Sequence, residues 1–219
     1  MMTYKDFKLF PLLLLLLLLF NTNSSFASVS GHLEYNSVLF DYSKLNFNSI
    51  KTDADKNFDM FLTAKNEVDK KYFLDLATSK YYILTKVDYS RIEPYIQLGR
   101  IYDYKNHPRL AKENFSKAIN LNADNPYANF YFGEFYYKRR DYKRALKYYK
   151  IAYNNGFNNR YDINYRMAII HEKFADLINA KKFYEISYSI QPDSKIQEKI
   201  QLLNELNYDK SEYYHIIRE

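Results

Sequence analysis

Histidine is the side chain that most often carries acid–base or metal chemistry near neutral pH, and this chain has four of them. They are His32, His107, His171 and His215, and no two of them have a metal-ligand spacing. His171 precedes Glu172, but no second histidine follows four residues later, so the pair is not a zinc-protease motif. We therefore interpret His171 as a packing residue and expect no metal site.

Other catalytic signatures are missing from the sequence. It contains no cysteine, which excludes disulfides, thiolate catalysis, cysteine-ligated zinc and a lipid-modified N-terminal cysteine. Neither a glycine-rich phosphate loop nor a nucleophile elbow nor a kinase motif is present. Because no acid–base or nucleophile set can be assembled, we predict that the protein is not an enzyme and uses no cofactor.

The densest charge cluster is Lys138-Arg139-Arg140, followed closely by Lys143 and Arg144. It is either a solvated turn between helices or a patch for an anionic lipid, glycan or nucleic acid. The net charge is +6, but the 32 basic and 26 acidic residues are interspersed, which favours a solvated surface. We expect no nucleic-acid partner.

The N-terminus has the three-part plan of a secretory signal. Lys5 and Lys8 precede an apolar run over residues 9–20, and Ser25-Phe26-Ala27 supplies small residues for cleavage. The run is shorter than the ~20 residues that a membrane-spanning helix needs. We predict a signal peptide over residues 1–27 and an exported, periplasmic or secreted protein. The alternative is that the segment is retained as a membrane anchor, and only then would membrane contact follow.

Residues 28–57 show apolar side chains without a lasting period, which predicts a linker or N-terminal extension with at most one short helix. The segment Thr52-Asp53-Ala54-Asp55 is predicted to cap the next helix, because Thr and Asp side chains accept hydrogen bonds from free backbone amides.

The remainder of the chain repeats. Alanines recur 34 residues apart, and finally 35 apart, at Ala77, Ala111, Ala145 and Ala180. An aromatic residue follows each of them four residues later, at Tyr81, Phe115, Tyr149 and Tyr184. Gly99 and Gly133 are also 34 residues apart, and each lies inside a stretch with helical apolar spacing. Glycine costs about 1 kcal/mol inside a helix, so we expect these two to lie at close contacts with the second helix, matched by Ala111 and Ala145.

These motifs resemble the tetratricopeptide repeat. One repeat reads Tyr95-x-x-Leu98-Gly99-x-x-Tyr102 and then Ala111-x-x-x-Phe115-x-x-Ala118. Related repeats begin with Asn129-x-x-Phe132-Gly133-x-x-Tyr136 and Asn164-x-x-Met167-Ala168-x-x-His171, and a degenerate one contains Phe61, Ala64, Val68, Ala77, Tyr81 and Leu84. The resemblance spans residues 58–194, with repeats at about 58–91, 92–125, 126–159 and 161–194. A Sel-like solenoid is an alternative for residues 145–194.

The resemblance implies an all-α fold, a right-handed superhelical solenoid of antiparallel helix pairs. Gly156 is predicted to end the helix before the third strong repeat. Residues 195–219 are predicted to form a capping helix and tail, with Ile196, Ile200, Leu203 and Leu206 on one face and Asp193 and Ser194 as its cap.

In tetratricopeptide solenoids the first helix of each repeat lines a concave groove. That implies a groove here made by Ile96, Arg100, Asp103, Tyr104, Tyr127, Phe130, Tyr131, Glu134, Tyr137, Tyr165, Arg166, Ile169 and Lys173. A carboxylate clamp, which some members of the family use, would be compatible with Asn66 and Arg166. However, Leu62, Ile96 and Tyr131 replace the other polar clamp residues, which disfavours that mode.

The function predicted from these features is a non-catalytic interaction scaffold of the cell envelope or exterior that binds a peptide or protein in the groove. The alternative is an envelope-associated structural component that binds lipid or glycan through the N-terminal segment or the basic patch.

Overall fold

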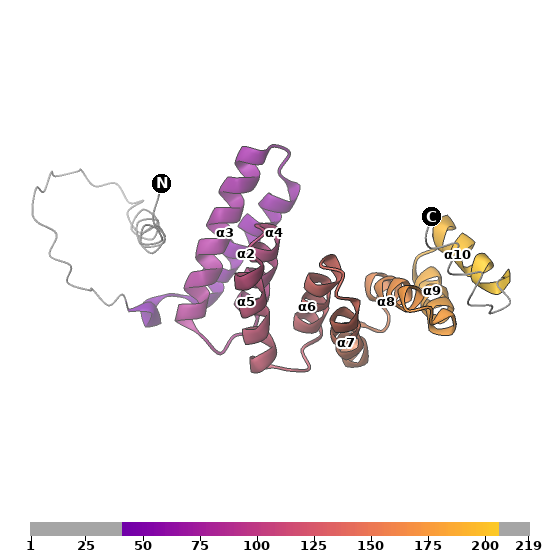
Figure 1. The fold of residues 1–219 in the computed structure, drawn as a ribbon. Helices are drawn as coiled ribbons and strands as arrows, with labels where there is room; N and C mark the ends of the chain where they lie inside the picture. The colour runs from indigo at the N-terminus through magenta and orange to yellow at the C-terminus, as the bar shows by residue number, and fades with distance from the viewer. Residues whose placement is uncertain (1–40, 206–219) are drawn as a thin grey trace, which may run out of the picture. The chain divides into compact units, whose positions relative to one another are not determined.

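A computed structural model describes residues 41–205, in which every regular element is a helix (Figure 1). The predicted signal peptide, the first part of the predicted linker, and Leu206 with the tail after it lie outside the described residues. No helix within residues 41–205 is both long enough and apolar enough to cross a membrane. The chain divides into two compact units, residues 1–83 and 84–219, and the boundary between them falls within helix α3.

The first unit begins its described part with a short 3-10 helix, Tyr42–Lys44, and then with helix α2, Phe47–Thr63. Asn46 caps α2, because its side chain accepts a hydrogen bond of 3.0 Å from the Ser49 amide. The prediction that residues 28–57 are a linker is therefore wrong for residues 47–57. The predicted cap at Thr52–Asp55 is wrong too, because that segment already lies inside the helix.

Helix α3, Glu67–Val87, is connected to α2 by a short turn and packs against it. The Tyr81 hydroxyl donates a hydrogen bond of 2.7 Å to Asp55, next to the fully buried Ala54. Val68, which the sequence assigns to the repeat pattern, is instead exposed, and Ala64 follows the end of α2. The reason is length: α2 and α3 have 17 and 21 residues, so the 34-residue register of the later repeats does not extend back to α2.

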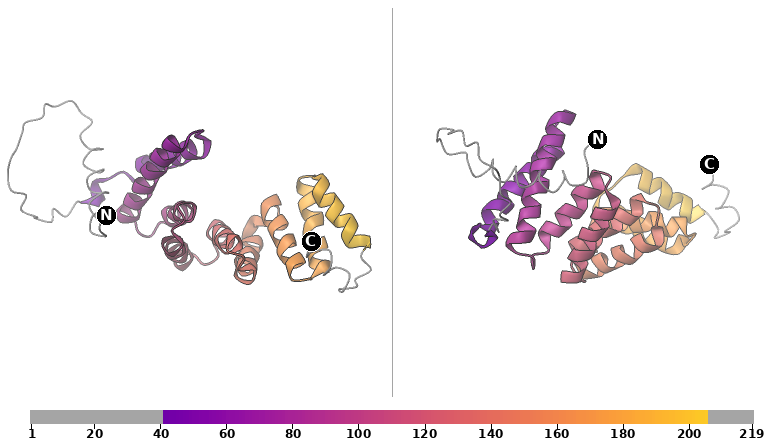
Figure 2. Two further views of the ribbon diagram at one scale, coloured as in Figure 1. Left: turned by 45° about the horizontal axis from the view of Figure 1, so that its top comes forward. Right: turned by 60° about the vertical axis from the view of Figure 1, so that its left-hand side comes forward.

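In its described part, up to residue 205, the second unit contains the end of α3, three helix pairs and a final helix (Figures 1 and 2). The pairs are α4 (Glu93–Tyr104) with α5 (Pro108–Leu121), α6 (Pro126–Lys138) with α7 (Tyr142–Ala152), and α8 (Tyr161–Lys173) with α9 (Leu177–Ile190). Short connections make the helices of each pair antiparallel, and consecutive pairs stack in chain order. The predicted all-α fold of antiparallel helix pairs is confirmed.

An aromatic ring covers a small residue inside the first two of these pairs. A Cβ atom on Gly99 would lie 2.6 Å from the Phe115 ring, and one on Gly133 would lie 2.6 Å from the Tyr149 ring. Close packing at both glycines was expected. The nearest neighbour, however, is the aromatic residue of the second helix and not Ala111 or Ala145, to which the sequence matched the glycines.

Two buried asparagines take the place of the first aromatic residue of the motif. The Asn129 side-chain amide donates to the carbonyls of Ala123 and Asn125, at 2.7 and 2.9 Å. Asn164 repeats the arrangement one pair later, with donations to Asn158 and Arg160 at 2.8 and 2.7 Å. Each asparagine thus ties its helix to the connection that precedes it, a role that the hydrophobic pattern did not reveal.

The turns inside the three pairs share one backbone geometry. Each contains a non-glycine residue with left-handed φ: 57° at Asn106, 58° at Arg140 and 55° at Ala175. The next amide then donates to a carbonyl five residues back, from His107 to Tyr102, from Asp141 to Tyr136 and from Asp176 to His171. This is the Schellman pattern, which satisfies the free carbonyls at the end of the first helix.

The end of the stack agrees with the predicted cap in its described part. Asp193 accepts hydrogen bonds from the amides of Lys195 and Ile196, which starts helix α10, Ser194–Glu205. Ile196 and Leu203 are buried. Gly156 has φ 108° in a π-helical turn over Tyr153–Phe157 and ends the helical conformation there, as expected.

Candidate functional site

The predicted groove residues lie on the first helices of the three pairs, and side-chain contacts join these helices. The Arg100 guanidinium on α4 lies 4.2 Å from the centre of the Tyr131 ring on α6. Arg166 on α8 donates to Glu134 on α6 at 3.0 Å and lies 4.6 Å from the centre of the Tyr137 ring. We name as the first-helix face the surface made by Arg100, Tyr104, Tyr127, Tyr131, Glu134, Tyr137, Tyr165, Arg166 and Ile169.

Two of the predicted groove residues belong to the core instead. Ile96 is 5% exposed and Phe130 is 6% exposed. The Phe130 ring packs against those of Tyr149 and Phe157, both at 5.9 Å between centres, and the Arg160 guanidinium lies 5.1 Å from it. Replacing Phe130 would therefore open a cavity, so it cannot serve as a surface probe.

Two further predicted groove residues, Asp103 and Lys173, lie at the ends of their helices. The nearly buried Asp103 carboxylate is held by Lys138 at 2.8 Å and by Arg139 at 2.7 Å, so it joins the ends of α4 and α6. Lys173 is exposed at the last position of α8, beside the turn.

The accessible part of the first-helix face is aromatic. Tyr104 is 56% exposed and Tyr127 is 53% exposed. Tyr127 rests edge-on against Phe157, with ring centres 4.9 Å apart, and Tyr165 stacks on Tyr161 at 5.7 Å. Packing on one side thus holds the rings of Tyr127 and Tyr165 in place, while Tyr104 and Tyr127 are largely open to solvent.

Glu134 is the electrostatic centre of the face. It accepts a hydrogen bond from the Tyr149 hydroxyl as well as the one from Arg166. Burial, reinforced by the negative charge of Glu134, raises the pKa of Tyr149 far above its ordinary value. Burial alone would lower the pKa of Arg166, but the Glu134 carboxylate raises it above the usual range. Both shifts keep Tyr149 and Arg166 in their ordinary protonation states near neutral pH, so the network fixes structure.

His171 is buried, as its interpretation as a packing residue requires. Its Nδ1 lies 2.9 Å from Asp176, and its ring stacks on Phe183 with centres 5.5 Å apart. Burial lowers the pKa of His171, although Asp176 acts in the opposite direction. Glu172 accepts hydrogen bonds from Tyr184 at 2.5 Å and Lys199 at 2.8 Å. Across residues 41–205, no cluster of histidine and acidic side chains is placed to hold a metal ion.

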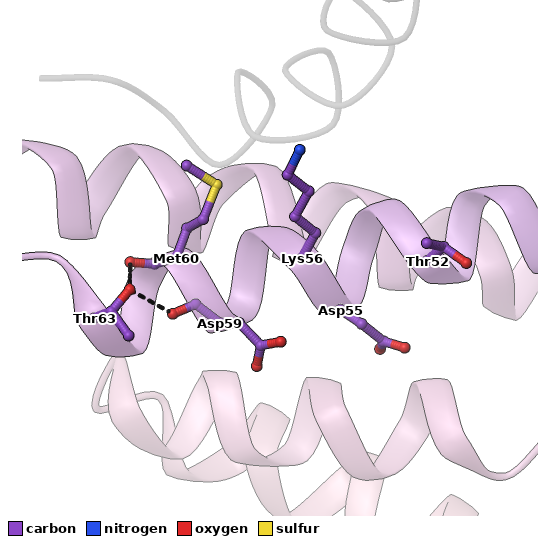
Figure 3. A pocket seen from close by; sticks show the side chains of 6 residues that line it. All are labelled: Thr52, Asp55, Lys56, Asp59, Met60 and Thr63. Carbon is purple, nitrogen blue, oxygen red and sulfur yellow. Dashed lines mark hydrogen bonds between the residues drawn. The ribbon is translucent and has the colours of Figure 1, made fainter.

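A shallow hollow runs along α2 in the first unit (Figure 3). Figure 3 shows that one helix supplies all its lining side chains, from Thr52, Asp55, Lys56, Asp59, Met60 and Thr63. Asp55 is already engaged by Lys51 at 2.6 Å and by the Tyr81 hydroxyl. The hollow thus offers an open helix surface and no enclosed site.

The carboxylate clamp gains no support from geometry. The Asn66 side chain accepts from the Asp69 amide at 2.8 Å, and its amide donates to the Asp69 carboxylate at 2.7 Å. Asn66 therefore caps the start of α3, while Arg166 is paired with Glu134. Both residues that could have served a clamp have structural partners.

Comparisons with known proteins agree with this architecture. A family model described as tetratricopeptide repeat matches residues 92–125. No curated protein matches the chain by sequence. Among solved structures, PilF of Pseudomonas aeruginosa is 16% identical, with 71% of this chain and 69% of that chain covered and a TM-score of 0.57.

Two other solved structures are similar to the same degree. MamA is 19% identical, with 77% of this chain and 90% of that chain covered and a TM-score of 0.55. PilW, described as a widely conserved type IV pilus biogenesis factor, is 17% identical, with coverages of 78% and 76% and a TM-score of 0.58. The chain thus carries a tetratricopeptide repeat at residues 92–125, and its described residues 41–205 have a helical solenoid fold of the tetratricopeptide type.

Proposed function

We propose that this chain is a non-catalytic interaction scaffold whose first-helix face binds an extended segment of a protein partner. The observation that supports the proposal is the continuity of that face. Arg100 bridges α4 to α6 through Tyr131, and Arg166 bridges α8 to α6 through Glu134. Three helices therefore present one surface along which an extended peptide could lie.

The chemistry of the face favours a particular kind of peptide. Tyrosine rings offer rigid, amphipathic contact area, which is why tyrosine is frequent at binding hot spots. Arg100 adds a cation to the face, whereas the charges of Arg166 and Glu134 offset each other within the protein. We infer that the partner segment combines apolar or aromatic side chains with acidic ones.

The proposed location is the cell envelope or exterior. Its support is the three-part pattern over residues 1–27, together with the likeness to PilW, which is described as a pilus biogenesis factor. Detection of the chain without residues 1–27, by mass spectrometry of protein from its native host, would test the cleavage. An intact N-terminus would favour an anchor.

The binding proposal can be tested with the full chain and a phage-displayed library of random peptides. We expect selected peptides to be enriched in apolar and acidic residues, and a synthetic peptide of that type to bind in a fluorescence titration. The double variant Tyr104→Ser and Tyr127→Ser should weaken binding by about tenfold or more, since each lost anchor costs about 1 kcal/mol or more.

The matched control is Tyr89→Ser. Tyr89 is exposed at the connection between α3 and α4 and does not belong to the first-helix face. The Tyr89→Ser variant should bind the peptide as tightly as the parent does, and all variants should keep the helical circular dichroism of the parent. Equal affinity of the selected peptide for the parent and for the double variant would refute the proposal.

A further inference from the structure

Unpaired basic side chains gather at the turns inside the three helix pairs of the second unit. Arg109 follows the turn between α4 and α5, Arg140 and Lys143 belong to the next turn, and Lys173 precedes the third. All four are exposed, and none makes an ion pair with any residue of the described range 41–205. We name these four residues the basic edge.

The turns lie along the same side of the stack because consecutive antiparallel helices return the chain to it every second connection. Asp103, at the end of α4, pairs with Lys138 and Arg139 at the end of α6, which places the first two turns side by side. Arg166 of α8 pairs with Glu134 of α6, which sets these two first helices side by side and so brings the third turn to the same side as the second. The charges of the basic edge thus act on one surface.

The connections between pairs, on the opposite side, have a different charge. They carry Asp88, Asp124 and Asp193 together with Arg91 and Arg160, and Arg160 pairs with Asp162 at the start of α8. Of these, Asp88 pairs with Arg91 and Asp193 caps α10. Acidic and basic side chains thus nearly balance in the described connections, whereas the exposed cations of the basic edge lie at the turns inside the pairs.

Exposed apolar side chains accompany these cations. Phe174 is 49% exposed and Ile178 is 70% exposed, and both lie at the turn between α8 and α9, next to Lys173. A soluble polyanion would be bound by charges alone and would leave these two side chains in water. A bilayer interface takes both kinds, because its phosphates attract cations and its headgroup–acyl boundary accepts apolar groups.

We propose that the basic edge docks on a bilayer rich in anionic phospholipid. Arg140, Lys143 and Lys173 lie against the lipid phosphates, and Phe174 and Ile178 enter the headgroup region. The proposal is independent of the peptide-binding function, because the first-helix face uses different residues and the edge could dock whether or not that face is occupied.

The absence of cysteine from the sequence provides a local test in the full chain. Ile178→Cys and Ala123→Cys are each labelled with an environment-sensitive dye. Ala123 is exposed at the connection between α5 and α6, on the side away from the basic edge. Each protein is added to vesicles of phosphatidylcholine, with or without phosphatidylglycerol, and the quenching of the dye by iodide is measured.

With phosphatidylglycerol present, the dye at residue 178 should shift to the blue and become protected from iodide, while the dye at residue 123 should stay quenchable. Without it, neither dye should be protected. Arg140→Gln, Lys143→Gln and Lys173→Gln in the Ile178→Cys background should each lower the ratio of docked to undocked edge by about fivefold, as expected from about 1 kcal/mol per basic side chain. Phe174→Ser should reduce the blue shift.

Two results would overturn the proposal. If residues 1–27 alone hold the chain on vesicles, the two dyes will be quenched equally. If the basic edge serves a soluble polyanion, heparin or RNA will bind in a manner that depends on Arg140, Lys143 and Lys173, and the dye at residue 178 will not respond to phosphatidylglycerol.

Discussion

A Cβ atom added to Gly99 would lie 2.6 Å from Cε1 of the Phe115 ring. Real Cβ atoms do not approach other heavy atoms so closely, so the ring occupies the space that any larger side chain would need. Gly133 and Tyr149 repeat the relationship one pair later. In these two pairs, an aromatic ring of the second helix therefore packs directly against the backbone of the first helix at its glycine.

Gly99→Ala should destabilise the protein. Helix propensity alone would stabilise the alanine variant by about 1 kcal/mol, whereas overpacking in a core costs about 1–3 kcal/mol. Phe115 is itself confined by Phe132 and Phe135, with ring centres at 5.4 and 5.9 Å, so it cannot swing away. We therefore expect the overpacking to dominate and the urea midpoint to fall.

The combination of Gly99→Ala with Phe115→Leu tests whether overpacking against the Phe115 ring is the reason that Gly99→Ala lowers stability. Because leucine has no ring at that position, the alanine should cost less in the Phe115→Leu background than in the parent. A midpoint that rises for Gly99→Ala alone would show that the helix contact is looser than the structure has it.

Tyr149→Phe should change how stability depends on alkaline pH. The pKa of Tyr149 is raised in the folded state, so above the unfolded value of about 10 the unfolded chain loses a proton that the folded chain keeps. Stability from this residue is complete below pH ~10 and is lost as pH rises beyond it, by about 1.4 kcal/mol per pH unit. Between pH 9 and 11, the free energy of unfolding measured with urea should fall less steeply for the phenylalanine variant than for the parent. The difference in slope should correspond to at most one proton.

Phe115→Leu is the matched control for that measurement. Phe115 holds the equivalent position one pair earlier and has no hydroxyl group. Its replacement should lower stability by a similar amount at every pH. If Tyr149→Phe and the parent decline in parallel, Tyr149 does not stay protonated in the folded state.

Ala175→Gly should stabilise the protein. Ala175 has φ 55° in the turn between α8 and α9, a conformation that costs a residue with a Cβ roughly 1–2 kcal/mol. Glycine removes that cost, but it raises the conformational entropy of the unfolded chain, which lowers stability by about 0.4–1 kcal/mol. We therefore expect a net increase of about 0.5–1 kcal/mol in the free energy of unfolding. The melting midpoint in calorimetry measures it.

Lys112→Gly is the counterpart within a helix. Lys112 is exposed inside α5, where glycine should cost about 1 kcal/mol. Opposite shifts of the midpoint for the two glycine variants would agree with the turn geometry, and shifts of the same sign would contradict it.

The sequence by itself determined the repeating helix pair. The spacing of Ala111, Phe115 and Gly99 recurs because each pair must solve the same local packing problem, so the pattern can be read without coordinates. The same logic located the final helix from Asp193 and Ile196, since caps and apolar periodicity act within one element.

Only the tertiary structure decided which side of each first helix is covered. Phe130 and Tyr131 are neighbours of similar character, yet one is core and the other borders the first-helix face, because the second helix, the Phe157 turn and Arg160 all converge on Phe130. The early start of α2 and the gathering of Arg140 and Lys173 along one edge were likewise hidden. Helical periodicity fixes the angle of a side chain around its own axis, but burial and charge sorting depend on where the neighbouring helices lie, and those distances are set by contacts between residues far apart in the chain.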